Sequence, residues 1–195
     1  SFTYYEQYCQ AFRIPFEPWE LDENFDYVPS ALDSLPDYSV VFLTTPNNPT
    51  GNVIPLDDMR NVLIRHRKSL FVVDEAYAEF VEQTMLPLLQ EHDNLVLLRT
   101  FSKGFCAAGV RCGVLFAQES IVQALMNLQT PWQLTPFTIE ATKVILEYTE
   151  NNPWFQEQVN AVVKERERLF KMLNRLNSRV YTIFPSQANF LLIKS

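Results

Sequence analysis

Polar and turn-forming residues follow three apolar stretches of the sequence, at the points where buried strands should end. The apolar stretches are SVVFLTT (39–45), SLFVVDEAY (69–77) and NLVLLRT (94–100). The first is followed by PNNPTG (46–51), the second closes with DEAY (74–77) and the third leads into TFSK (100–103). In parallel sheets, ligands bind outside the carboxyl ends of the strands. The spacing therefore predicts a small-molecule site at one edge of a sheet.

Lys103 is the amine in these motifs, and it stands at the start of an apolar, glycine-rich stretch (104–113). Lysine is almost never fully buried without a partner. An amine in such surroundings can form an imine with a carbonyl group, which removes its ordinary charge. Once released, the same amine can transfer a proton. The pattern therefore indicates a reactive lysine.

The side chains of the three motifs match the needs of one cofactor, pyridoxal 5′-phosphate. This group requires a lysine for imine formation and a carboxylate that keeps its pyridine nitrogen protonated, and Lys103 and Asp74 supply them. Asn48 and Tyr77 can donate hydrogen bonds to its phenolic oxygen. Hydroxyl and guanidinium groups suit its phosphate. The candidates for the phosphate are Thr100, Ser102 and Arg111.

The motifs together resemble the signatures of the fold-type-I pyridoxal phosphate aminotransferases of classes I and II. The matching segments are TPNNPTG (45–51), VVDEAY (72–77) and RTFSKGFCAAGVRCG (99–113), in the expected order and at the expected separations. The resemblance implies that Lys103 is the catalytic lysine. It also implies that SFTYY (1–5) places the ring of Phe2 against the cofactor. The cofactor-binding residues implied in this way are Phe2, Asn48, Asp74, Tyr77, Thr100, Ser102, Lys103 and Arg111, with no metal.

Within that family the chain is most similar to the histidinol-phosphate aminotransferases. This likeness includes DEAYAEF (74–80), KERERL (164–169) and ANFLLIKS (188–195). It implies amino transfer between a phosphorylated amino alcohol or amino acid and 2-oxoglutarate, in histidine biosynthesis. Two alternatives stay open. FTYY (2–5) and TPWQL (130–134), with Trp132, resemble threonine-phosphate decarboxylase, and the aminotransferase fold also occurs in non-catalytic, ligand-sensing domains fused to DNA-binding modules.

Each of these residues, taken alone, has a plainer interpretation. Lys103 could be a surface lysine, and Asp74 and Glu75 could cap a helix. NNPTG (47–51) could be an ordinary turn, and Arg111 could be one half of a surface ion pair. Their joint placement on three successive strand ends favours a shared site.

Composition favours a protein that handles small molecules. The 195 residues carry a formal net charge of −7, which argues against a nucleic-acid-binding face. We see no membrane-spanning run and no leader segment. Cys9, Cys106 and Cys112 lack metal-type spacing, so we expect reduced thiols and a cytoplasmic location. The partners expected are a small-molecule amino donor, a 2-oxo acid and, from the family likeness, a second copy of the protein.

The glycines are few and gathered in one region. All four, Gly51, Gly104, Gly109 and Gly113, lie within the window 51–113. We therefore expect the special backbone geometry there, with Gly104 and Gly109 letting the chain approach the cofactor closely.

Apolar periodicity predicts alternating strands and helices, which is typical of an α/β fold with a mainly parallel sheet flanked by helices. The expected strands are 39–45, 69–77, 94–100, 112–117, 179–184 and 189–194. The expected helices are 1–12, 28–36, 55–68, 82–92, 119–129, 136–149 and 153–177.

Two domains are expected: a cofactor-binding large domain (1–130) and part of a smaller α+β domain (131–195). The first domain starts without the strand that should precede it, and the second stops directly after a strand. We therefore expect a piece of a longer protein. From the family likeness, a phosphate-binding loop would lie before Ser1 and a carboxylate-binding arginine after Ser195. The chain alone is accordingly expected to be inactive.

Overall fold

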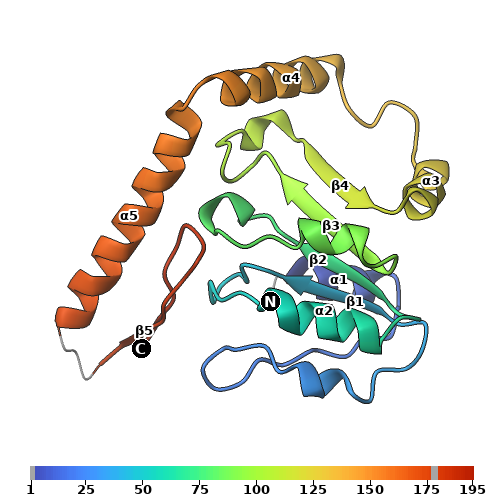
Figure 1. Cartoon of the computed structure of the whole chain (residues 1–195), viewed down its shortest axis with the longest axis horizontal. Helices are drawn as coiled ribbons and strands as arrows, with labels where there is room; N and C mark the ends of the chain where they lie inside the picture. The colour runs from blue at the N-terminus through green and yellow to red at the C-terminus, as the bar shows by residue number, and fades with distance from the viewer. Residues whose placement is uncertain (1–2, 177–179) are drawn as a thin grey trace.

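A four-stranded sheet with the order β1-β2-β3-β4 lies at the centre of the structure (Figure 1). The computed structural model describes residues 3–176 and 180–195. The strands are β1 (Val40–Thr44), β2 (Leu70–Asp74), β3 (Leu95–Thr100) and β4 (Gly113–Ala117). β1, β2 and β3 run parallel, and β4 pairs antiparallel with β3. The predicted mainly parallel sheet is therefore confirmed.

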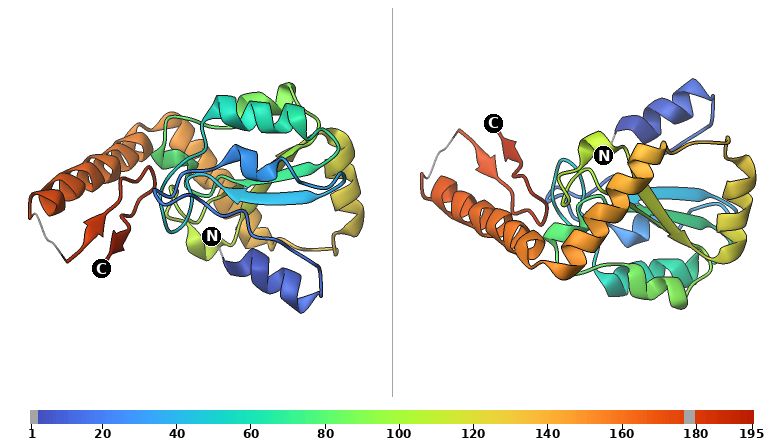
Figure 2. Two further views of the ribbon diagram at one scale, coloured as in Figure 1. Left: turned by 90° about the horizontal axis from the view of Figure 1, so that it is seen from below. Right: turned by 90° about the horizontal axis from the view of Figure 1, so that it is seen from above.

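Helices lie on both faces of this sheet. α2 (Leu56–Arg65) connects β1 to β2, with Asp57 and Asp58 in its first turn and Arg65 in its last, as the helix dipole favours. α1 (Thr3–Ala11) lies on the opposite face (Figure 2). The two helices therefore enclose the sheet from opposite sides.

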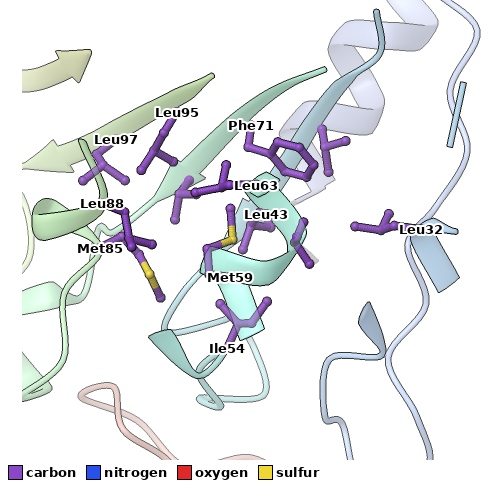
Figure 3. Packing of buried hydrophobic residues seen from close by; sticks show 13 residues of the cluster. Leu32, Leu43, Ile54, Met59, Leu63, Phe71, Met85, Leu88, Leu95 and Leu97 are labelled. Atoms are coloured by element: carbon purple, nitrogen blue, oxygen red, sulfur yellow. The ribbon is translucent and has the colours of Figure 1, made fainter. Parts of the chain in front are cut away.

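The main core fills the space between the sheet and α2 (Figure 3). Its fully buried members include Phe71 on β2, Leu95 and Leu97 on β3, and Met59 and Leu63 on α2. Burial of each such side chain contributes roughly 1.5–3 kcal/mol. This packing fixes β2 and β3 side by side, so that their carboxyl ends lie at one edge of the molecule.

The helix predicted over 82–92 is wrong, because this segment holds only a 3₁₀ turn, η3 (Leu86–Gln90). Pro87 lacks a backbone donor, and the N–H of Met85 binds the Glu75 carboxylate at 2.6 Å instead of a helical carbonyl. The predicted helix 28–36 likewise reduces to η1 (Pro29–Leu32), since Pro29 opens the segment and Pro36 closes it.

The rest of the chain is helical and ends in a small hairpin. α3 (Glu119–Leu128), α4 (Pro136–Asn151) and α5 (Trp154–Arg175) follow β4, and α5 lies to one side of the sheet (Figure 1). The predicted closing strands are present but short, as β5 (Thr182–Ile183) and β6 (Ile193–Lys194), which pair antiparallel. Among the described residues, no helix has the length and apolar character needed to cross a membrane. The domain boundary at 130/131 falls between α3 and α4 and stays a prediction.

The loop between β5 and β6 contacts the carboxyl ends of the central strands. Ala188 packs in a second apolar cluster with Tyr77, Phe80 and Val159, and its carbonyl accepts a 2.8 Å hydrogen bond from Arg166. The N–H of Gln187 donates to the carbonyl of Gly51 at 2.7 Å. The C-terminal segment is thereby joined to the edge where the motifs lie.

Candidate active site

Tyr77 is the centre of the site at the strand ends. Its hydroxyl accepts a 3.3 Å hydrogen bond from Nδ2 of Asn48, which follows β1. The ammonium of Lys103, which follows β3, lies 5.5 Å from the centroid of the Tyr77 ring. Asn48 and Lys103 therefore both lie beside Tyr77, and the three residues come from the three separate motifs that were predicted to share a site.

Asp74 lies beside this group, at the last position of β2. Its Oδ1 accepts a 2.9 Å hydrogen bond from the N–H of Ala76, and its Oδ2 accepts one of 2.8 Å from the hydroxyl of Tyr5. Burial raises the pKa of the Asp74 carboxyl, while the two hydrogen bonds and the charge of Lys103 act in the opposite direction. Asp74 is thus a half-buried carboxylate whose charged form is supported by donors.

Sequence reasoning missed Tyr5. It sits on α1, and its ring stacks on Phe42 of β1 at 4.8 Å between centroids. Phe2, which was predicted to stack on the cofactor, lies outside the described residues. Positions three apart share one face of a helix, so the choice of Phe2 could have drawn attention to Tyr5 as well. Apart from this spacing, no feature of the sequence separated Tyr5 from the neighbouring Tyr4 and Tyr8.

Of the predicted phosphate-binding residues, Thr100 is the last residue of β3, and Ser102 and Arg111 lie on the loop between β3 and β4. The hydroxyl of Thr100 accepts a 3.1 Å hydrogen bond from the N–H of Ser102 and donates to the carbonyl of Cys112 at 3.4 Å. Thr100 pairs with Gly113 across the ladder, which brings Arg111 back to the same end of the sheet. The Arg111 guanidinium is exposed and donates to the Ala108 carbonyl at 3.1 Å. It forms no hydrogen bond with Thr100 or Ser102 within the described part of the chain.

Glu75 joins the carboxyl ends of β2 and β3 from the other side. Its carboxylate is almost fully buried and accepts hydrogen bonds from Nε and one terminal nitrogen of Arg99, at 3.0 and 2.9 Å. It also accepts bonds from the Thr84 hydroxyl and the Met85 N–H. The prediction for Glu75 was only a helix cap, because its partners are 9 to 24 residues away in the sequence.

Gly104 lies in a close contact that the sequence did not predict. A Cβ at this position would stand 2.5 Å from Cγ of Glu79. Oε2 of Glu79 is buried without a hydrogen-bond partner among the described residues, and burial raises the pKa of this carboxyl. At Gly109 no atom lies within 4 Å of the position of a Cβ. Packing against Glu79 accounts for Gly104, and no contact in the described chain accounts for Gly109.

The chemistry of the donor set fits pyridoxal 5′-phosphate. Asp74 offers a carboxylate, Asn48 and Tyr77 offer an amide and a phenol in mutual contact, and Lys103 offers an exposed amine next to them. These are the groups that this cofactor requires around its ring. The residues present at the strand ends are therefore compatible with the predicted cofactor.

The full sequence matches the model of one protein family. Residues 1–195 match the model described as Aminotransferase class I and II. A histidinol-phosphate aminotransferase of Thermococcus kodakarensis is 38% identical over 196 residues, covering 100% of this chain and 55% of the relative. The corresponding protein of Ruminiclostridium cellulolyticum is 36% identical, with coverage of 100% and 54%. The chain thus spans about half the length of these curated relatives.

Solved structures show the same fold. The histidinol-phosphate aminotransferase of Clostridium acetobutylicum superposes with a TM-score of 0.87 at 22% identity, covering 100% of this chain and 59% of that one. The L-threonine-O-3-phosphate decarboxylase of Porphyromonas gingivalis gives a TM-score of 0.80 at 24% identity, with coverage of 100% and 57%. At this level of identity both structures establish the fold, which the two activities share.

Proposed function

Because the chain belongs to the aminotransferase class I and II family, we propose that the whole protein is a pyridoxal 5′-phosphate-dependent aminotransferase of the histidinol-phosphate type. Pyridoxal 5′-phosphate is the cofactor of this family. When bound, it supplies an electron sink for the α-carbon of an amino substrate. The relatives named for histidinol phosphate support this substrate type.

One observation carries the proposal: Asn48, Tyr77 and Lys103 meet beside Asp74 at the ends of adjacent strands. The register of the sheet places Thr44 of β1 opposite Asp74 of β2, so the loop with Asn48 leaves the sheet at the same level as Asp74. The arrangement depends on residues that follow three different strands, so it does not arise from the local sequence of any single motif.

Each residue has a proposed role that follows from its chemistry. Asp74 would pair with the pyridine nitrogen and keep it protonated. Lys103 would hold the cofactor and would supply the amine that moves a proton at the substrate α-carbon. Asn48 and Tyr77 hold the phenolic oxygen. Thr100, Ser102 and Arg111 would bind the phosphate, and Phe2 would contact the face of the ring.

The proposed reaction transfers an amino group from a phosphorylated amino alcohol or amino acid to 2-oxoglutarate. Lys103 can remove the α-proton from a phosphorylated amino alcohol or from an amino acid, because in both donors this proton is bound to the carbon that carries the amino group. The alternative reaction at this carbon is the loss of carbon dioxide. The histidinol-phosphate relatives at 36–38% identity favour proton removal.

We also propose that the whole protein is a cytoplasmic homodimer, with residues 1–130 in its large domain and 131–195 in its small domain. Large apolar side chains are exposed on the edge strands β1 and β4, including Phe42 and Phe116. Exposed apolar surface of this kind is typical of sites that other chains cover.

The test is an assay of the whole protein with histidinol phosphate and 2-oxoglutarate, following glutamate. Glutamate formation that is lost in Lys103→Ala is the expected result. A parallel assay with threonine phosphate follows carbon dioxide. Carbon dioxide release without glutamate would replace the proposal with the decarboxylase. Cofactor binding without turnover of any amino donor would identify a ligand-sensing domain instead.

A further inference from the structure

The hydrogen bond between Tyr5 and Asp74 joins two elements that are 69 residues apart in the sequence. Tyr5 comes from α1 on one face of the sheet, and Asp74 ends β2 in the middle of it. The contact measures 2.8 Å from the Tyr5 hydroxyl to Oδ2. Oδ1 is held independently by the N–H of Ala76 at 2.9 Å. Both carboxylate oxygens are therefore fixed, and the plane of the carboxylate is set.

This arrangement leaves acceptor capacity on Asp74. An ionised carboxylate has about four lone-pair positions, of which the two hydrogen bonds use two. A further donor, such as a protonated ring nitrogen, can therefore bind Asp74 without displacing Tyr5. Hydrogen bonds to the charged form favour that form, which opposes the effect of burial on this carboxyl.

The ring of Tyr5 is held in place, and its hydroxyl acts as the hydrogen-bond donor to Asp74. Its ring stacks on Phe42 at an interplanar angle of 27°. Burial and the neighbouring charge of Asp74 raise the pKa of the Tyr5 hydroxyl, so it keeps its proton. The geometry and the protonation of Tyr5 both support donation to Asp74.

We propose that Tyr5 is a positioning residue, which orients Asp74 and stabilises its ionised form so that the pyridine nitrogen of the cofactor stays protonated. This inference rests on the proposed function. Tyr5 acts through Asp74, and no direct contact of Tyr5 with substrate or cofactor is needed. The alternative is a purely structural role, in which Tyr5 only attaches α1 to β1 through Phe42.

The decisive variant is Tyr5→Phe, which keeps the ring that stacks on Phe42 and removes only the hydroxyl. Tyr8→Phe is the matched control, since Tyr8 lies on the same helix with 60% of its surface exposed. The probe is pyridoxal 5′-phosphate labelled with ¹⁵N in the ring and bound to the whole protein. Its nitrogen chemical shift reports protonation directly, without turnover.

In Tyr5→Phe we expect the ring-nitrogen signal to move toward the unprotonated position. We also expect the cofactor dissociation constant to rise by about tenfold, the effect of losing one hydrogen bond to a charged group. Tyr8→Phe should match the wild type in both measurements. In an Asp74→Asn background the effect of Tyr5→Phe should shrink, because the charge that Tyr5 stabilises is absent. A structural role predicts the same effect in both backgrounds.

An unchanged nitrogen shift in Tyr5→Phe, together with a changed shift in Asp74→Asn, would overturn the role of Tyr5 and leave the proposed function intact. Failure of the wild-type protein to bind the labelled cofactor would refute the proposed function itself. If Tyr5→Phe unfolds, as judged by circular dichroism, Tyr5 is structural and the inference is wrong.

Discussion

Asp74 and Glu75 are adjacent in the sequence, yet their carboxylates make contacts on opposite faces of the sheet. Successive residues of an extended strand point to opposite faces. Asp74 therefore reaches Tyr5 and the site, while Glu75 reaches Arg99 and the segment before η3. The DEAY motif thus combines one residue with a proposed chemical role and one that holds two strand ends together.

Removal of the Glu75 carboxylate should strongly destabilise the fold. Glu75→Ala leaves the largely buried Arg99 without its charged partner, which costs about 3–5 kcal/mol of unfolding free energy. Glu91→Ala is the control, because Glu91 pairs with Arg60 at the surface, where solvent screens the ion pair, so its loss should change the free energy of unfolding far less. Urea unfolding of both variants measures the difference. Equal costs would show that the Glu75 network does not stabilise the strand ends.

Glu79 should make stability depend on pH. Burial raises the pKa of this carboxyl in the folded state above its ordinary value of 4.5. The folded state then holds the proton more tightly than the unfolded chain, so the contribution of Glu79 to stability is fully present below pH 4.5 and is lost as the pH rises through the folded pKa. Glu79→Gln removes this titration. The variant should gain unfolding free energy relative to wild type as the pH rises from 4 to 7, and a constant difference over that range would contradict the assignment.

At the scale of elements, the turn after β1 depends on one glycine. Gly51 has φ of +76°, and a Cβ there would stand 2.1 Å from Oγ of Ser186, in the loop between β5 and β6. Both the backbone conformation and the close approach require glycine at this position. The close packing of PNNPTG (46–51) against the loop between β5 and β6 therefore requires glycine at position 51.

Gly51→Ala should destabilise the protein by more than about 1 kcal/mol, the cost of a strained left-handed residue plus a steric clash. Gly109→Ala is a matched control, since Gly109 has open space around it and no left-handed backbone, and it should be neutral or slightly stabilising. Thermal unfolding of the two variants checks this expectation. Similar melting temperatures for both would show that the contact with Ser186 does not constrain the turn.

The sequence predicted the strands and their ends well, because each strand is a continuous apolar run closed by a polar motif. It therefore also predicted that Asn48, Asp74, Tyr77 and Lys103 lie at one edge. It failed where a long-range contact overrides local preference. The Glu75 carboxylate takes the N–H of Met85, so the expected helix over 82–92 does not form, and the Tyr5 contact depends on how α1 folds back onto the sheet.

At the scale of the whole molecule, apolar surface on the edge strands is exposed. Val40 and Phe42 of β1 and Val114, Leu115 and Phe116 of β4 are each 37–56% exposed. Exposed apolar surface promotes association in water. We therefore expect other chain segments to cover these two edge strands.

The 195-residue chain by itself should accordingly self-associate, whereas the whole protein should be a homodimer. Size-exclusion chromatography with light scattering measures both masses over a range of concentrations. A stable, non-associating monomer of the isolated chain would show that the exposed apolar surface does not drive association. A fully active monomer of the whole protein would refute the proposed dimer.

The proposed chemistry depends above all on Lys103 as the residue that bonds to the cofactor. The most direct measurement is borohydride reduction of the whole protein with bound pyridoxal 5′-phosphate, followed by peptide mapping by mass spectrometry. We expect the phosphopyridoxyl group on Nζ of Lys103, and no labelled peptide in Lys103→Ala. A label on a different lysine, or no covalent label in the cofactor-bound wild type, would contradict it.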